Sequence, residues 1–285
     1  MSFEKRLDEL GKTVQFAEEI FELSYEKFSQ ENDVLPNEIT VGMLLFRKMI
    51  EKMDAVFILL ENGSEQPAES IVRDLFENLL YLKFIMNEEK CNERALSYIF
   101  SGYKDKFNTV NLVSAKNRDG EMIREYLNSR VPLEELIERK TQLEKAMNKE
   151  CFRNIKVEWK KLSEIKNGNK KRRVFPKWYN LFQGPKNIRE LAKIYNLEPI
   201  YYILYSNYSK QVHSTNAFQQ VNEMESGMMV LKEIRSNEPS AASANLLLNA
   251  RSFGEMAIKN YVDFFSLQPK VNLAKWHLEN IEMMK

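Results

Sequence analysis

The sequence predicts an all-α protein, a multi-helix bundle in which one long charged helix lies on the surface. Only 9 Gly and 8 Pro occur among 285 residues, too little turn punctuation for a β sandwich or a Rossmann fold. Apolar residues recur every three or four positions through most of the chain, which is the period of an amphipathic helix. The abundance of Leu, Lys and Glu and the 13 Met suit the same fold class.

The N-terminal third predicts three helices. Residues 3–30 carry a rough apolar stripe, and a second helix begins after Pro36 and ends at Gly63, where a glycine commonly follows the last helical residue. Ser64 can cap the third, with Pro67 in its first turn. Its apolar stripe is nearly continuous, so we expect this helix at the centre: the stripe residues are Ile71, Leu75, Leu79, Leu82 and Met86.

The remaining chain predicts further helices and no strand. Pro132 should start a long charged helix that runs to about Leu162 and lies on the surface, and the Gly- and Asn-containing stretch 166–173 is the clearest loop. The other expected helices span 90–113, 121–128, Asn187 to Ile194, 200–213, Ser240 to about Leu267, and a short C-terminal segment with Trp276. We expect one helical domain over 1–285, with 130–175 as a surface helix and basic-loop insertion.

Charge and cysteine content bound the function classes. The 42 basic and 41 acidic residues nearly cancel, so only local patches can indicate a nucleic-acid partner. Cys91 and Cys151 lack motif spacing, which favours reduced thiols and argues against a zinc site. The charged N-terminus and the absence of a long apolar run predict a cytoplasmic protein without a membrane helix. We expect neither a metal nor a cofactor.

Polar residues interrupt two helices where apolar ones are expected. Arg73 and Glu77 lie four apart in the central helix and share one face. In the helix predicted for 200–213, one row of hydroxyls ends in an imidazole: Tyr202, Ser206, Ser209 and His213, with Tyr205 beside it. Such a row must find hydrogen-bond partners when it packs.

Each polar set has a plain structural interpretation and a functional one. The Arg73–Glu77 pair can be a structural ion pair, and His213 a hydrogen-bonding group at a helix end. Alternatively, Arg73, Glu77 and His213 converge at one cleft. There the histidine would be the general base and Arg73 would stabilise charge on a phosphate, with Tyr202, Tyr205, Ser206 and Ser209 around them.

The basic loop suggests a second nucleic-acid element. Lys170, Lys171, Arg172 and Arg173 are followed by the aromatic residues Trp178, Tyr179 and Phe182. Cations that contact phosphates and rings that stack on bases suit single-stranded RNA or DNA. A solvated loop is the alternative.

These motifs, in this order, resemble a bacterial domain-of-unknown-function family numbered five-six-seven-seven. The residues that carry the resemblance are Arg73-x-x-x-Glu77-x-x-x-Tyr81, Trp178, Ile188-x-x-Leu191-Ala192, and Tyr202-x-x-Tyr205-Ser206-x-x-Ser209-x-x-x-His213-Ser214, and the likeness covers about residues 40–265. The resemblance implies an α-helical fold and a distant likeness to HEPN nucleases and abortive-infection proteins of phage defence. HEPN nucleases carry Arg and His on one helix; here Arg73 would supply the cation from another.

Three functions follow from the residues and the resemblance. The first is a phage-defence or stress protein that binds RNA or cleaves it without a metal, with a homodimer bringing two sites together. The second is a non-enzymatic interaction module for a protein partner, in which the polar row only fixes helix packing. The third is a sensor that binds a small anionic ligand at Arg73.

Overall fold

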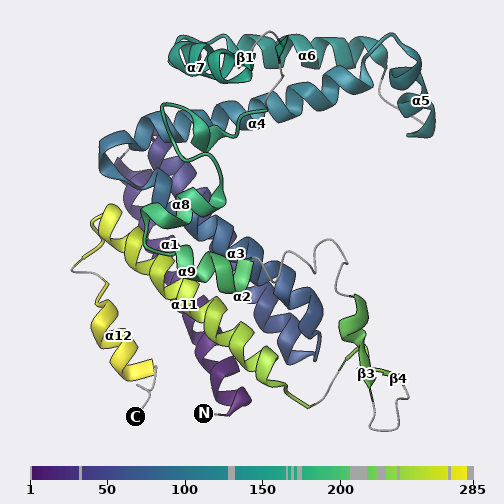
Figure 1. Ribbon diagram of the computed structural model, residues 1–285. Helices are drawn as coiled ribbons and strands as arrows, with labels where there is room; N and C mark the ends of the chain where they lie inside the picture. Colours follow the sequence, from purple (N-terminus) through teal and green to yellow (C-terminus); the bar gives the residue numbers. More distant parts are fainter. Residues whose placement is uncertain are drawn as a thin grey trace. The chain divides into compact units, whose positions relative to one another are not determined.

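The computed structural model describes residues 2–31, 34–127, 132–164, 166–167, 170–171, 175–205, 217–223, 229–235, 238–268 and 271–280. The chain forms two compact units, the first made of 1–91 and 187–285 and the second of 92–186. The architecture is all-α, which confirms the predicted multi-helix bundle (Figure 1). The expectation of one domain stays a prediction, and each unit is described by itself.

Four long helices make the core of the first unit (Figure 1). They are α1 (Phe3–Glu31), α2 (Asn37–Glu61), α3 (Glu65–Ile85) and α11 (Ala241–Phe264). Helix α3 packs on both α2 and α11, and its buried face carries Val72, Leu75, Phe76, Leu79 and Leu80. The prediction that this helix lies at the centre is therefore confirmed.

The turn between α2 and α3 follows from the glycine that the sequence places there. Gly63 has a φ of 71°, the left-handed region that costs glycine least. Its N–H donates to the Leu60 carbonyl, and the Ser64 N–H donates to the Leu59 carbonyl. These two bonds satisfy carbonyls at the helix end and form a Schellman motif, so α2 ends where the sequence predicts.

Helices α2 and α11 approach closely because one of them carries a glycine at the contact. A Cβ atom on Gly254 would lie 2.1 Å from the Met53 sulfur, so no larger residue fits without movement. Nearby, the rings of Phe46 and Tyr261 stack with centroids 3.9 Å apart, and the Tyr261 hydroxyl shares a hydrogen bond with Ser24. This contact fixes the register of α11, which carries charged residues described below.

A short helical segment packs against α3 in the same unit. It comprises α8 (Ile188–Ile194), α9 (Glu198–Ile200) and the π-helical turn η4 (Tyr201–Tyr205). The Asn187 side chain accepts from the Glu190 N–H, as predicted for a cap. The Tyr195 hydroxyl donates to the Lys83 carbonyl, which ties the segment to α3. Residues 206–216, the rest of the helix predicted for 200–213, lie outside the described residues.

The second unit is a group of helices around an aromatic core. Phe100 of α4 packs against Phe152 and Trp159, with ring centroids 5.6 Å away in both cases, and Tyr98 packs edge-on against Trp178. Its elements are α4 (Cys91–Val113, beginning in the first unit), α5 (Arg118–Tyr126), α6 (Leu133–Met147), η2 (Glu150–Phe152), α7 (Arg153–Ser163) and η3 (Trp178–Asn180).

Two sequence expectations differ from the structure. The charged stretch from Pro132 to Leu162 forms two helices, because α6 ends at Met147 and the extended backbone of Lys149 redirects the chain. This break lets Phe152 and Trp159 reach the aromatic core. Two short antiparallel hairpins also occur where no strand was expected: β1 (Lys166–Asn167) with β2 (Lys170–Lys171), and β3 (Val221–Glu223) with β4 (Met229–Leu231).

The remaining helix of the first unit is α12 (Leu273–Asn280), which follows α11. The Trp276 ring of α12 stacks on Phe16 of α1 with centroids 4.3 Å apart. Among the residues described, no helix is both long enough and apolar enough to cross a membrane.

Candidate functional site

Arg73 and Glu77 form an ion pair on α3, as their spacing predicts. The Arg73 Nη2 lies 2.9 Å from the Glu77 Oε1, and the two side chains are only 19% and 17% exposed. The Tyr81 hydroxyl, one turn further on, donates to the other Glu77 oxygen at 3.3 Å. A charge pair at this depth is screened less by water than a surface pair, so its interaction energy depends more strongly on its geometry.

Tyr205 completes this group from the π-helical turn η4. The Arg73 Nη2 donates to the Tyr205 hydroxyl at 2.7 Å, and the guanidinium carbon lies 4.4 Å from the centre of the same ring. Burial, assisted by the Glu77 charge, raises the pKa of Tyr205 to about 12, against the opposing effect of Arg73. Tyr205 is therefore a neutral phenol that holds Arg73 by a hydrogen bond and a cation–π contact.

The segment Tyr201–Tyr205 (η4) is a π-helical turn. A π turn widens the helix by one residue, and such turns recur at functional sites. Tyr201 stacks on Tyr205 with centroids 4.9 Å apart, which supports the ring that faces Arg73. Tyr202 lies elsewhere: it is exposed, and its ring contacts Arg189, which is itself paired with Glu198 at 2.8 Å. The described contacts therefore bring Arg73, Glu77 and Tyr205 together without Tyr202.

Several residues named from the sequence lie outside the described residues. They are Ser206, Ser209, His213, Arg172 and Arg173, together with the side chains of Lys170 and Lys171. The convergence of His213 with Arg73 thus stays a prediction.

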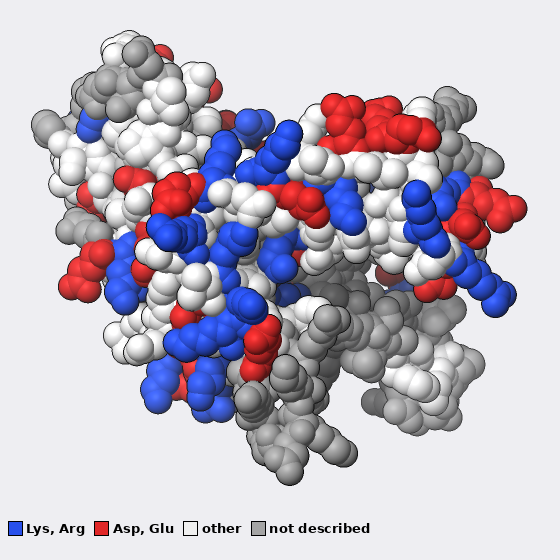
Figure 2. All heavy atoms as spheres, turned by 90° about the horizontal axis from the view of Figure 1, so that it is seen from above, with Lys and Arg blue, Asp and Glu red and all other residues white. Residues whose placement is uncertain are grey.

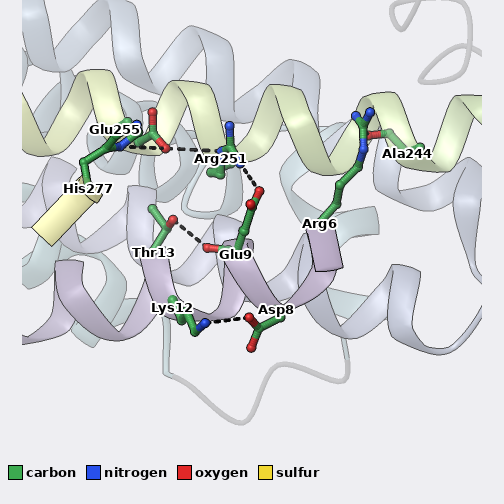
Figure 3. A network of polar contacts seen from close by, with 9 residues as sticks. All are labelled: Arg6, Asp8, Glu9, Lys12, Thr13, Ala244, Arg251, Glu255 and His277. Atoms are coloured by element: carbon green, nitrogen blue, oxygen red, sulfur yellow. Dashed lines mark hydrogen bonds and ion pairs between the residues drawn. The ribbon is translucent and has the colours of Figure 1, made fainter. Parts of the chain in front are cut away.

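A second charged group, which the sequence reading missed, connects α1, α11 and α12 (Figure 3). Arg251 forms ion pairs with Glu9 and with Glu255, the latter with 3.2 Å between Nε and Oε1. The His277 Nδ1 lies 3.9 Å from the same Glu255 oxygen. Arg6 donates from Nη1 to the Ala244 carbonyl at 3.2 Å nearby.

Glu9 is the most deeply buried charge of this group, at 2% side-chain exposure, beside an Arg251 that is 13% exposed. Two carboxylates therefore share one guanidinium inside the bundle. Burial raises the pKa of Glu255, while the charges of Arg251 and His277 oppose this shift. His277 lies half-exposed next to this carboxylate.

One sequence signal could have found part of this group. Arg251-x-x-x-Glu255 repeats the spacing of Arg73-x-x-x-Glu77, and its helix carries only two other charged residues, Lys259 and Asp263. Glu9 gives no comparable signal, because its partner is 242 residues away along the chain.

The surface charge does not itself mark a nucleic-acid site. On the face seen in Figure 2, blue basic and red acidic side chains are interspersed, as expected from a net charge of +1. In the described part of the chain, no three His, Cys, Asp or Glu residues are grouped to hold a metal ion. The two buried arginine groups are therefore the features to explain.

Comparison with known proteins supports the resemblance stated above. The model of a family described as "Family of unknown function (DUF5677)" matches residues 39–229, two-thirds of the chain. Arg73, Glu77, Tyr205 and His213 lie inside the match, whereas Glu9, Arg251, Glu255 and His277 lie outside it. No curated protein and no solved structure matches the chain. The likeness to HEPN nucleases stays a prediction.

Proposed function

We propose, from the premise that the chain belongs to the Family of unknown function (DUF5677), that it binds RNA at Arg73 and cleaves it without a metal. Arg73, Glu77 and Tyr205 would form the described part of the site, and His213 would supply the general base. A role in phage defence or stress response is part of the same proposal and rests on the resemblance alone.

The observation that carries the proposal is the way Arg73 is held. Its described ion pair with Glu77 and its hydrogen bond to Tyr205 both use the single nitrogen Nη2. Its Nε is buried without a hydrogen-bond partner among the described residues. A guanidinium can donate five hydrogen bonds, so an anchored Arg73 retains donors for a phosphate oxygen.

In the sequence, the proposed base follows Tyr205 closely, which supports the proposal. Tyr205, in contact with Arg73, directly precedes the stretch that carries Ser206, Ser209 and His213. His213 is the eighth residue after Tyr205. A connection this short permits the imidazole to come near Arg73, since an extended chain spans about 3.3 Å per residue.

The reaction would use the 2′-hydroxyl of the RNA as the nucleophile. His213 would take the 2′-hydroxyl proton, the 2′-oxygen would bond to phosphorus, and the bond from phosphorus to the 5′-oxygen would break. Arg73 would stabilise the added negative charge on the phosphate oxygens. The leaving 5′-oxygen would take a proton from solvent and His213 would return its proton to solvent, which gives a 2′,3′-cyclic phosphate and a 5′-hydroxyl.

The test measures RNA binding and cleavage in the presence of a chelator, with DNA of the same sequence as the control substrate. His213→Ala should abolish cleavage and leave RNA binding, whereas Arg73→Gln should weaken binding about tenfold or more, since a charge-assisted contact is worth about 1.5–3 kcal/mol. Arg47→Gln is the matched control, because Arg47 forms an exposed pair with Glu51 at the same spacing. Wild-type binding and cleavage by the Arg73 and His213 variants would refute the proposal.

The contact of Arg73 with both Glu77 and Tyr205 also favours a second candidate. In that case the group only docks η4 onto α3, and the protein acts as a non-enzymatic interaction module. Arg73→Gln would then lower the stability of the chain. The wild-type chain would neither bind nor cleave RNA. The four cations of Lys170–Arg173 form a separate candidate RNA contact in either case. Replacing all four with Gln and repeating the RNA-binding measurement tests it.

A further inference from the structure

A cavity of about 810 Å³ lies between α11 and α12, on residues that the RNA proposal does not use. Its α11 wall includes Glu255, Ile258 and Lys259, and its α12 wall includes Trp276 and His277. Pockets for small molecules usually have volumes of about 300–1,000 Å³ and combine an apolar lining with a few placed polar groups. This cavity has both properties.

The apolar side of the cavity is built from side chains that are already fixed. Ile258 and Val271 are buried in the bundle, and Leu273 and Leu278 add aliphatic surface from α12. The Trp276 ring is held by its stack on Phe16. A ligand with an apolar body would therefore meet a wall that needs little rearrangement.

His277 lies beside a carboxylate that also pairs with an arginine. Its Nδ1 faces the Glu255 Oε1 at 3.9 Å, and Glu255 is paired with Arg251, which is paired in turn with the buried Glu9 (Figure 3). The second imidazole nitrogen, Nε2, has no partner among the residues that the structure describes. This nitrogen can therefore form a hydrogen bond with a ligand in the cavity.

Lys259 supplies positive charge to the same cavity. It makes no ion pair within the described part of the chain, although it stands four residues from both Glu255 and Asp263 on α11. Glu255 is paired with Arg251, and the Asp263 carboxylate accepts a hydrogen bond from Gln268. Burial, assisted by the charge of Lys259, lowers the pKa of Lys83 on α3, whose ammonium group lies over the Tyr195 ring.

We propose that this cavity binds a small organic anion with an apolar body, whose carboxylate or phosphate contacts Lys259 and His277. The ligand body would lie along Ile258, Leu273 and Trp276. Lys259 has no ion-pair partner within the described part of the chain, and a bound anion would supply one. The site lies outside the family match, so its failure and that of the RNA proposal are independent.

Trp276 provides a direct measurement of binding. The chain has 3 Trp, and the other two belong to the second unit, so a Trp159→Phe/Trp178→Phe background isolates Trp276 fluorescence. Decanoate and decyl phosphate, below their micelle concentrations, are the probes, with decanol and decyltrimethylammonium as neutral and cationic controls. We expect saturable fluorescence changes with both anions and weak or no changes with the controls.

Two charge variants decide whether the proposed contacts hold the anion. Lys259→Gln should weaken binding of both anions about tenfold, and His277→Gln should weaken it less. Lys275→Gln is the control, because Lys275 lies on α12 but faces Glu279 rather than the cavity. Equal affinity for decanol and decanoate, unchanged affinity in Lys259→Gln, or no binding at all would each overturn the proposal. A preference for one probe anion identifies the headgroup as carboxylate or phosphate.

Discussion

Two regions of the first unit use the same Arg-x-x-x-Glu spacing in different surroundings. On α3, Arg73 pairs with Glu77 and rests on the ring of Tyr205, a neutral partner. On α11, Arg251 pairs with Glu255 and with Glu9, a second carboxylate that is almost completely buried. The Arg73 guanidinium is paired with one carboxylate, whereas the Arg251 guanidinium is shared between two.

This difference separates a group that can bind a ligand from one that the fold requires. Removal of Arg251 would leave Glu9 buried without the partner that balances its charge. Removal of Arg73 would leave Glu77, which Tyr81 still contacts. Arg47–Glu51 on α2 has the same spacing in an exposed setting, with Arg47 63% exposed, and therefore serves as the reference for both.

The largest expected effect is that of breaking the Arg251 group. Arg251→Met should lower the free energy of unfolding by about 3–5 kcal/mol, since it strands a buried carboxylate. Arg47→Met should cost less than about 1 kcal/mol. Urea denaturation followed by circular dichroism measures both.

A double variant distinguishes a stranded charge from lost packing. Glu9→Leu combined with Arg251→Met removes both charges, and we expect it to be more stable than Arg251→Met alone. If the two single losses simply add, the interpretation of Glu9 as an unpaired charge is wrong.

The next effect concerns the helix contact that positions Arg251 and Glu255. Gly254→Ala should cost about 1–3 kcal/mol, because its Cβ would overlap the Met53 sulfur. Gly102→Ala is the matched control: it lies in the interior of α4 with nothing within 4 Å of its Cβ, and should stabilise the chain by up to about 1 kcal/mol. Equal effects of the two variants would mean that α11 can shift freely against α2.

The fold was more predictable than the charged groups, for a physical reason. Helix periodicity, Pro36, Gly63 and the Asn187 cap are local signals, and the helices they predict are found. The break at Asn148–Lys149 was missed because both neighbouring stretches carry the same charged helical pattern. The hairpins were missed because their strands are only two or three residues long.

The candidate site was predictable only as far as one helix turn reaches. Arg73 and Glu77 could be paired from their spacing, and Tyr205 was named, although its contact with Arg73 spans 132 residues of chain. Nothing local indicates that Glu9 meets Arg251, or that His277 lies beside Glu255. Contacts of this kind depend on how α1, α11 and α12 pack, which spacing along the chain does not specify.

A smaller effect is expected at the Arg73 group. Arg73→Met should lower stability by about 1–2 kcal/mol, less than Arg251→Met, because Glu77 keeps Tyr81 and some access to water. Tyr205→Phe keeps the ring under the guanidinium and removes only the hydroxyl, so it should cost less than Arg73→Met. A loss at Arg73 as large as that at Arg251 would show that the two groups are energetically alike.

The smallest effect is a dependence of stability on alkaline pH that belongs to Tyr205. Its pKa in the folded chain is about 12, whereas a tyrosine in an unfolded chain ionises near about pH 10. Between these values the unfolded state loses a proton that the folded state keeps, so Tyr205 should weaken the fold as pH rises through this interval. The expected loss is about 1 kcal/mol after allowance for the exposed part of the ring.

The measurement is the difference in unfolding free energy between wild type and Tyr205→Phe at several pH values; this difference should shift in favour of the variant above about pH 10. A constant difference would show that Tyr205 ionises as an ordinary surface tyrosine, and that Glu77 and burial do not retain its proton.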